Sequence, residues 1–253
     1  GFMIIKWDIT IPQRSGDQVR KAYVYLPESY EEDPERRYPV MYLFDGHNVF
    51  FDEDATYGTS WGMYDYMEES GKQLILVGIE CNREGDGRLR EYAPVTFEDS
   101  ELGRIEGEGK RYMHWLIKEL KPYIDGNFRT LPDRENTLIC GSSMGGLMAL
   151  YAATTFNHVF QRAACLSPSL WVAPERMLEL MARAHIRRDT CIYLDYGAGE
   201  MSNHAANAEV LFSASHLLMA KRVNLTFRIV PGGTHCEASW ARQVPIFMEC
   251  LGV

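Results

Sequence analysis

The chain has 253 residues, of which 46% are hydrophobic and 24% charged, and this ordinary globular composition excludes a disordered or collagen-like protein. We expect a single domain over residues 1–253, because neither a linker nor an internal repeat interrupts the chain. With 26 basic against 35 acidic residues, the net charge of −9 disfavours a general nucleic-acid binder, which would need a basic face.

The first forty residues favour β structure. Short apolar or alternating runs at 3–11 and 19–26 flank a turn-rich segment at 13–17, which predicts an antiparallel hairpin. Further strands are predicted over residues 40–44, 74–79, 137–140, 163–166, 191–194 and 225–230. Helices are predicted over residues 61–70, 112–124, 147–156, 175–184, 205–221 and 237–251. This alternation predicts an α/β protein with a mainly parallel central sheet and helices on both faces.

One long segment, residues 81–109, is rich in charges and glycines and shows little periodicity. It follows a predicted strand, so it should lie at the carboxyl edge of the sheet, where ligands bind in such folds. We interpret it as a rim or lid over a site, and a solvated surface loop without a role is an equally good reading.

The candidate nucleophile is Ser143. Residues 141–146 read Gly-Ser-Ser-Met-Gly-Gly and fit the pattern G-x-S-x-G. The pattern follows a predicted strand and opens a predicted helix, which is the context that a nucleophile elbow requires. The glycines are needed because side chains there would collide with neighbouring backbone. The helix start also directs free N–H groups and a positive dipole end toward the site.

A serine at its ordinary pKa is a poor nucleophile, so a base is needed. Among the seven histidines we favour His235, which ends the segment Pro-Gly-Gly-Thr-His at 231–235. This segment lies between the last predicted strand and the last predicted helix. His235 also follows Ser143 in the chain, in the order nucleophile, acid, base. We therefore expect His235 to act as the general base.

The acid should lie in the turn after the strand at 191–194, where two carboxylates are available. Asp195 is still close to the strand. Glu200 lies past two glycines, on a loop that can curl toward His235. We favour Glu200 over Asp195 as the third member of the triad, and both remain candidates.

Two main-chain amides are expected to form an oxyanion hole. One is the N–H of Met144, which follows the nucleophile, and the other is the N–H of His47, in the turn after the strand at 40–44. Gly46 would give this turn room to bend inward. The acidic residues 52–54 invite a calcium interpretation, but they lack a full ligand set, so we predict a solvated loop and no metal site.

The chain resembles the esterase D-like branch of the α/β hydrolases over nearly its whole length. The stretches that carry the resemblance are residues 42–46, 141–146, 166–171, 196–200 and 232–240. The branch includes feruloyl and acetyl-xylan esterases, enterobactin-type siderophore esterases and S-formylglutathione hydrolases. The resemblance implies an α/β-hydrolase fold with Glu200 as the acid, and it places Arg90, within residues 90–94, near the site.

Aromatic residues near these loops are candidates for substrate contact. Trp171 follows a strand end and Trp61 begins a helix after the oxyanion turn, and core packing is an equally good reading for either tryptophan. The segment after the strand at 163–166 is short, so we expect an open site with no large cap domain.

The resulting hypothesis is a serine hydrolase of carboxylic esters that needs no cofactor and acts on a small-molecule or carbohydrate-linked acyl ester. An acyltransferase with the same triad and an inactive, ligand-binding hydrolase fold are the alternatives. The six scattered cysteines and the absence of a visible signal peptide favour a cytoplasmic protein, and no apolar run is long enough to span a membrane. The oligomeric state stays open.

Overall fold

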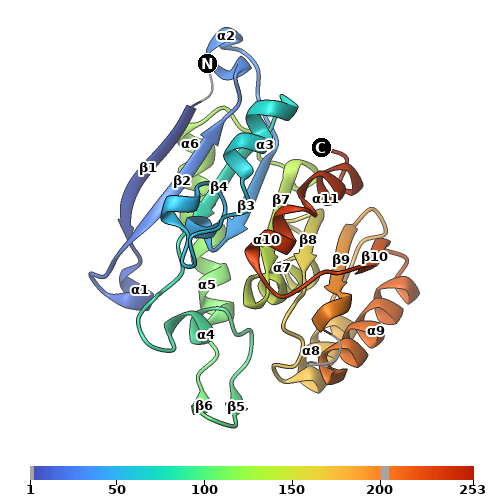
Figure 1. Cartoon of the computed structure of the whole chain (residues 1–253). Coiled ribbons are helices and arrows are strands. Elements are labelled where there is room, and N and C mark those ends of the chain that lie inside the picture. Colours follow the sequence, from blue (N-terminus) through green and yellow to red (C-terminus); the bar gives the residue numbers. More distant parts are fainter. Residues whose placement is uncertain (1–2, 201–204) are drawn as a thin grey trace.

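The computed structural model describes residues 3–200 and 205–253. Its centre is an eight-stranded sheet with the order β1-β2-β4-β3-β7-β8-β9-β10 (Figure 1). The strands are β1 (Met3–Thr10), β2 (Val19–Leu26), β3 (Val40–Phe44), β4 (Ile75–Ile79), β7 (Thr137–Ser142), β8 (Arg162–Leu166), β9 (Cys191–Gly197) and β10 (Asn224–Val230). The strands β3, β4 and β7 to β10 pair in parallel, whereas β1 pairs with β2, and β2 with β4, antiparallel. The predicted sheet and hairpin are confirmed.

Helices cover both faces of this sheet (Figure 1). One face carries α3 (Met63–Ser70), α10 (Glu237–Ala241) and α11 (Val244–Cys250). The other carries α5 (Gly109–Trp115), α6 (Lys121–Asn127), α7 (Met144–Thr155), α8 (Pro174–Arg183) and α9 (Ala205–Ala220). Shorter helices are α1 (Pro12–Ser15) and α2 (Ser29–Glu32). The central strands β3 and β4 are buried along their whole length, which explains their unbroken apolar sequences.

Prolines coincide with departures from regular α-helix in two of the predicted helices, of which the first stays helical throughout. The helix expected over 112–124 consists of α5, a π-helical turn at Leu116–Leu120 and α6, which has Pro122 in its first turn. The helix expected over 237–251 is separated into α10 and α11, and Pro245 lies in the first turn of α11. A proline lacks the N–H that a continuous helix needs, so each new helix starts where its proline is tolerated.

The long segment at 81–109 contains short elements that its sequence pattern did not predict. They are α4 (Gly87–Glu91), β5 (Phe97–Asp99) and β6 (Gly103–Ile105). Glu91 at the end of α4 forms a buried ion pair with Arg20 of β2, with a nitrogen–oxygen distance of 2.8 Å. This contact fastens the segment to the sheet, and no local periodicity could reveal it. The two-stranded β5–β6 hairpin projects beyond the main sheet (Figure 1).

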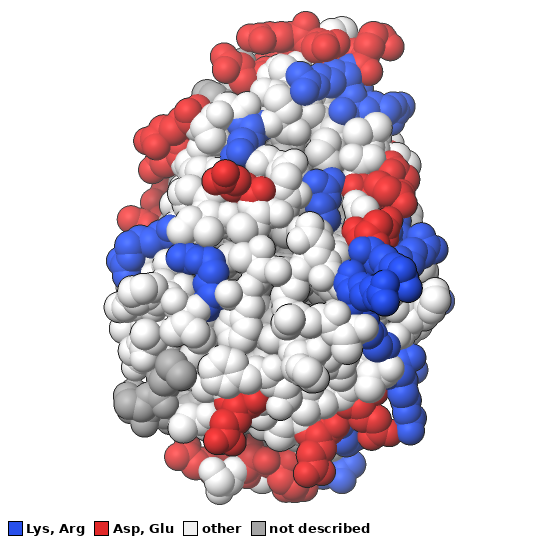
Figure 2. All heavy atoms as spheres, turned by 90° about the vertical axis from the view of Figure 1, so that its right-hand side faces the viewer, with Lys and Arg blue, Asp and Glu red and all other residues white. Residues whose placement is uncertain are grey.

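The expected absence of a cap domain is confirmed between β8 and α8, because β8 ends at Leu166 and α8 begins at Pro174. Figure 2 shows the side of the molecule on which α9 and β10 lie: a broad uncharged region occupies its middle, and charged side chains of both signs surround it. Within residues 3–200 and 205–253, no helix has the length and apolar character needed to cross a membrane. All six cysteines are free thiols.

Candidate active site

A strained turn between β7 and α7 presents Ser143. Its φ of 61° and ψ of −123° lie outside the regions that non-glycine residues normally occupy. The glycines around it allow close backbone approach: a Cβ on Gly141 would lie 2.3 Å from the carbonyl oxygen of Gly145, and one on Gly146 would lie 2.7 Å from that of Leu166. The sequence G-x-S-x-G therefore folds into the sharp strand-to-helix turn that exposes the serine hydroxyl.

Ser143, His235 and Glu200 lie in one continuous series of hydrogen-bonding distances. The Oγ of Ser143 is 2.9 Å from Nε2 of His235, and Nδ1 of His235 is 2.6 Å from Oε1 of Glu200. The serine comes from the end of β7, the glutamate from the turn after β9 and the histidine from the segment after β10. Parallel strands bring these three ends to the same edge of the sheet.

The carboxylate of Glu200 is buried, and its side chain is only 3% exposed. Burial alone would raise the pKa of Glu200, but hydrogen bonds from His235, from the Ser167 hydroxyl and from the Gly197 amide outweigh it and hold the pKa below its usual value. Glu200 is therefore ionised at neutral pH and can stabilise positive charge on the histidine ring.

The alternative acid, Asp195, points elsewhere. It lies within β9, which extends to Gly197 rather than ending at residue 194 as expected. Its carboxylate accepts hydrogen bonds from the Tyr193 hydroxyl at 2.7 Å and from the Ser167 amide at 3.1 Å. Burial raises the pKa of Asp195 to about 6, although these hydrogen bonds oppose the rise.

The two amides expected to form an oxyanion hole belong to separate elements, and His47 lines the same cavity as Ser143. Met144 is the first residue of α7, so its N–H has no carbonyl within the helix to bond. His47 lies in the single 3-10 turn at Gly46–Asn48 that follows β3. A Cβ on Gly46 would lie 2.4 Å from the carbonyl carbon of Gly78, so only glycine lets this turn lie so close to β4.

An ion pair braces the turn at Gly46–Asn48. Asp45, with a left-handed φ of 56°, immediately precedes the turn. Nε and Nη2 of Arg88 donate to its two carboxylate oxygens at 2.9 and 2.8 Å, and the amide of Asp45 donates to the Tyr92 hydroxyl at 3.1 Å. Arg88 belongs to α4, so the long charged segment at 81–109 acts here as a brace.

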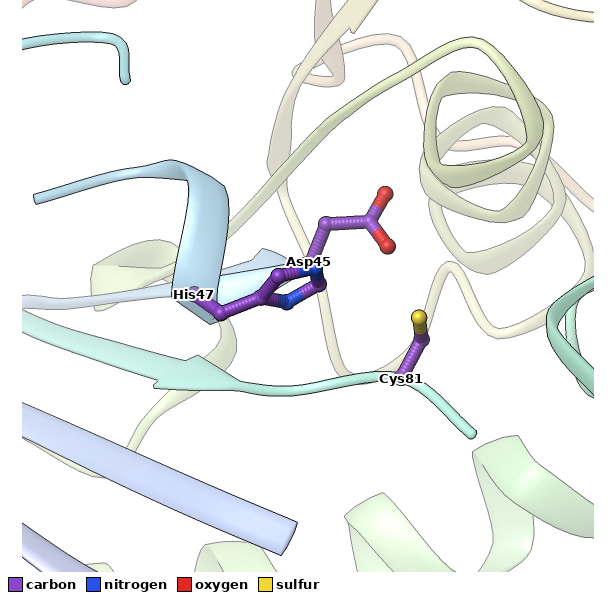
Figure 3. A group of neighbouring side chains, drawn as sticks. All are labelled: Asp45, His47 and Cys81. Atoms are coloured by element: carbon purple, nitrogen blue, oxygen red, sulfur yellow. The ribbon is translucent and has the colours of Figure 1, made fainter. Parts of the chain in front are cut away.

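The same region contains three potential metal ligands, Asp45, His47 and Cys81, whose ligand atoms lie within 4.8 Å of one another (Figure 3). The thiol of Cys81 points toward the carboxylate of Asp45 (Figure 3). Burial raises the pKa of that thiol and lowers the pKa of His47, so both groups are neutral. Both oxygens of Asp45 are already bonded to the cationic Arg88. The trio therefore fits the ion-pair brace better than a metal centre.

Removing the brace should destabilise the fold in a pH-dependent manner. Burial alone would raise the pKa of Asp45, but Arg88 outweighs it and lowers the pKa below the model-compound value of 3.8. The pair therefore contributes stability above that value, and this contribution is lost as the pH falls through the folded-state pKa. We expect Arg88→Met to lower the free energy of unfolding by about 1–3 kcal/mol at neutral pH, since Arg88 itself is partly solvated.

Thermal unfolding checks this expectation. The difference in Tm between parent and Arg88→Met should be largest near neutrality and should shrink as the pH falls below 3.8 and through the folded-state pKa of Asp45, where the parent loses the charge on Asp45. Arg104→Met is the matched control, because Arg104 is 65% exposed and pairs with the exposed Glu106. An equal loss of stability in both variants would contradict the brace.

A cavity of about 510 Å³ opens beside Ser143, the candidate nucleophile. Ser143, His235 and His47 line it together with charged and aromatic residues that sequence reasoning did not single out: Asp45, Arg83, Arg88, Glu237 and Trp240. Sequence reasoning could have identified Glu237 and Trp240, because they follow His235 in the stretch 232–240 that carries the family resemblance.

Three residues expected near substrate do not line this cavity. Trp61 is 4% exposed and packs edge-on against Phe247, so it lies in the core. Arg90 is paired with Asp86 and Glu108. Trp171 is 42% exposed, but its ring packs against Phe97 of the β5–β6 hairpin.

Comparisons with known proteins show the family and the fold of the chain. The family model described as "Putative esterase" matches residues 14–246. The chain is 25% identical over 154 residues to the uncharacterized protein YbbA of Bacillus subtilis, which covers 60% of this chain and 58% of YbbA. It is 29% identical over 147 residues to Esterase Rv1288 of Mycobacterium tuberculosis, which covers 58% of this chain but only 28% of that protein. The crystal structure of an IroE-like serine hydrolase from Shewanella oneidensis superposes with a TM-score of 0.77 at 20% identity, covering 98% of this chain and 81% of the other.

Proposed function

Because the chain belongs to this esterase family, we propose that it hydrolyses carboxylic esters, with Ser143 as nucleophile, His235 as general base and Glu200 as the acid that orients the histidine. The observation that carries the proposal is the hydrogen-bonded series from Ser143 through His235 to Glu200, with distances of 2.9 and 2.6 Å. Ser143 and His235 line a cavity that is large enough for a small-molecule acyl ester.

The reaction follows from the positions of these groups. Nε2 of His235 accepts the proton of Ser143 as its Oγ attacks the ester carbonyl carbon, and the carbonyl oxygen becomes an oxyanion. The amides of Met144 and His47 donate hydrogen bonds to that oxyanion. The tetrahedral intermediate collapses, the carbon–oxygen bond to the alcohol breaks, and His235 returns its proton to the departing alcohol. A water molecule, deprotonated by His235, then cleaves the acyl-enzyme and restores Ser143.

A fluorophosphonate probe tests the nucleophile directly. Such a probe phosphonylates only an activated serine, so intact mass spectrometry of the parent should show one adduct per chain. Ser143→Ala should show none and should lose turnover of p-nitrophenyl acetate. The neighbouring Ser142→Ala is the matched control, since Ser142 ends β7 and is absent from the hydrogen-bonded series. An adduct that persists in Ser143→Ala would refute the assignment.

A further inference from the structure

We infer that Ser167 is a positioning residue of the reaction, which acts by fixing the orientation of the Glu200 carboxylate; this inference rests on the proposed function. Ser167 follows β8 and is 1% exposed. Its hydroxyl donates to Oε2 of Glu200 at 2.8 Å, and the Gly197 amide donates to the same oxygen at 2.9 Å. With Oε2 held by two donors, Oε1 is directed at Nδ1 of His235.

The hydroxyl of Ser167 is itself oriented by a second partner. Nε1 of Trp240 donates to the Ser167 oxygen at 3.4 Å. The Ser167 hydroxyl carries a single hydrogen. Because its oxygen accepts a hydrogen bond from Trp240, that hydrogen is directed at Glu200. The Trp240 ring also packs edge-on against the ring of His235, with centroids 5.0 Å apart. Trp240 therefore contacts His235, and Ser167 contacts Glu200. The orientation of these two groups relative to each other is what the base needs.

The backbone around Ser167 connects the acid to the nucleophile. The Ser143 amide donates to the carbonyl oxygen of Leu166 at 2.9 Å, and the Ser169 amide donates to the carbonyl oxygen of Ser143 at 3.1 Å. These contacts, and the bond from the Ser167 amide to Asp195, involve the main chain of residues 166–169. Replacing Ser167 with alanine therefore removes the hydrogen bond to Glu200 and leaves the main-chain contacts in place.

Steady-state kinetics with p-nitrophenyl acetate provides the first test. We expect Ser167→Ala to lower kcat about tenfold and to leave KM within about twofold, because the side chain orients the base without lining the substrate cavity. Ser215→Ala is the matched control: its buried hydroxyl donates to the carbonyl of Leu211 within α9, and kcat should not change. An unchanged kcat in Ser167→Ala overturns the inference.

A double-mutant cycle separates positioning from a general structural role. If Ser167 acts only through Glu200, then Ser167→Ala should change the rate of fluorophosphonate labelling less than about twofold in a Glu200→Ala background. The same tenfold loss in both backgrounds would show that Ser167 acts independently of the carboxylate, which overturns the inference.

A second variant guards against misfolding. Ser167 has a φ of 42°, which glycine adopts without strain, so Ser167→Gly should fold and should reproduce the loss of kcat. A folded Ser167→Gly with full activity refutes the positioning role. Failure of the proposed function would give a different result. In that case turnover would survive in Ser143→Ala, whatever the Ser167 variants do.

Discussion

Replacing His235 with alanine is expected to lower kcat by about 10⁴-fold or more, because nothing then accepts the Ser143 proton. The histidine side chain is 41% exposed, so its loss leaves no deep cavity in the core and the fold should remain intact. Turnover of p-nitrophenyl acetate measures the first effect, and thermal unfolding checks the second. KM should change little, since the lost interaction acts mainly in the transition state.

His216→Ala provides the control for this experiment. His216 is an exposed histidine on α9, outside the cavity, and its replacement should leave kcat unaltered. A His235→Ala variant that keeps kcat within tenfold of the parent would mean that a different group serves as the base.

The second large effect is expected from Glu200→Gln, which preserves the size of the side chain. Glu200 accepts hydrogen bonds from three donors, at His235, Ser167 and Gly197. A glutamine has one acceptor oxygen, and its amide group favours the histidine tautomer with the proton on Nε2. That tautomer cannot accept the proton of Ser143, so we expect kcat to fall by about 10³–10⁴-fold.

The same substitution should alter stability with a defined dependence on pH. The folded-state pKa of Glu200 is lowered below its usual value of 4.5, so its ionised form stabilises the fold above that value. This contribution disappears as the pH falls through the folded-state pKa. The difference in Tm between Glu200→Gln and the parent should therefore be largest near neutrality and shrink as the pH falls below 4.5 and through the folded-state pKa of Glu200.

Asp195→Asn is the informative comparison for Glu200→Gln, because Asp195 lies in β9 and Glu200 in the turn that follows it, and both were candidates. Asp195 contacts Tyr193 and Ser167 rather than His235, so we expect its replacement to lower kcat less than about tenfold. If Asp195→Asn instead abolished turnover and Glu200→Gln did not, the assignment of the acid would be reversed.

The amino-acid sequence alone was sufficient to predict the order of the strands of the main sheet and of the longer helices, because apolar periodicity depends on which face of each element is buried. It also indicated the candidate nucleophile and base, since both follow predicted strands and parallel strands end at a common edge. Ser143 was accessible to such reasoning because its turn requires glycines at fixed spacing, as the close approach at Gly141 illustrates.

Tertiary structure alone decided the features that depend on contacts between remote segments. The direction of the Glu200 carboxylate depends on Ser167 and Trp240, which lie on other elements. The ion pair between Arg88 and Asp45 joins segments that share no local pattern. Periodicity specifies which residues are buried, but not which partners they meet, because side-chain direction is determined only when the elements pack. For the same reason the sequence could not separate Trp61, a core residue, from a residue that lines the cavity.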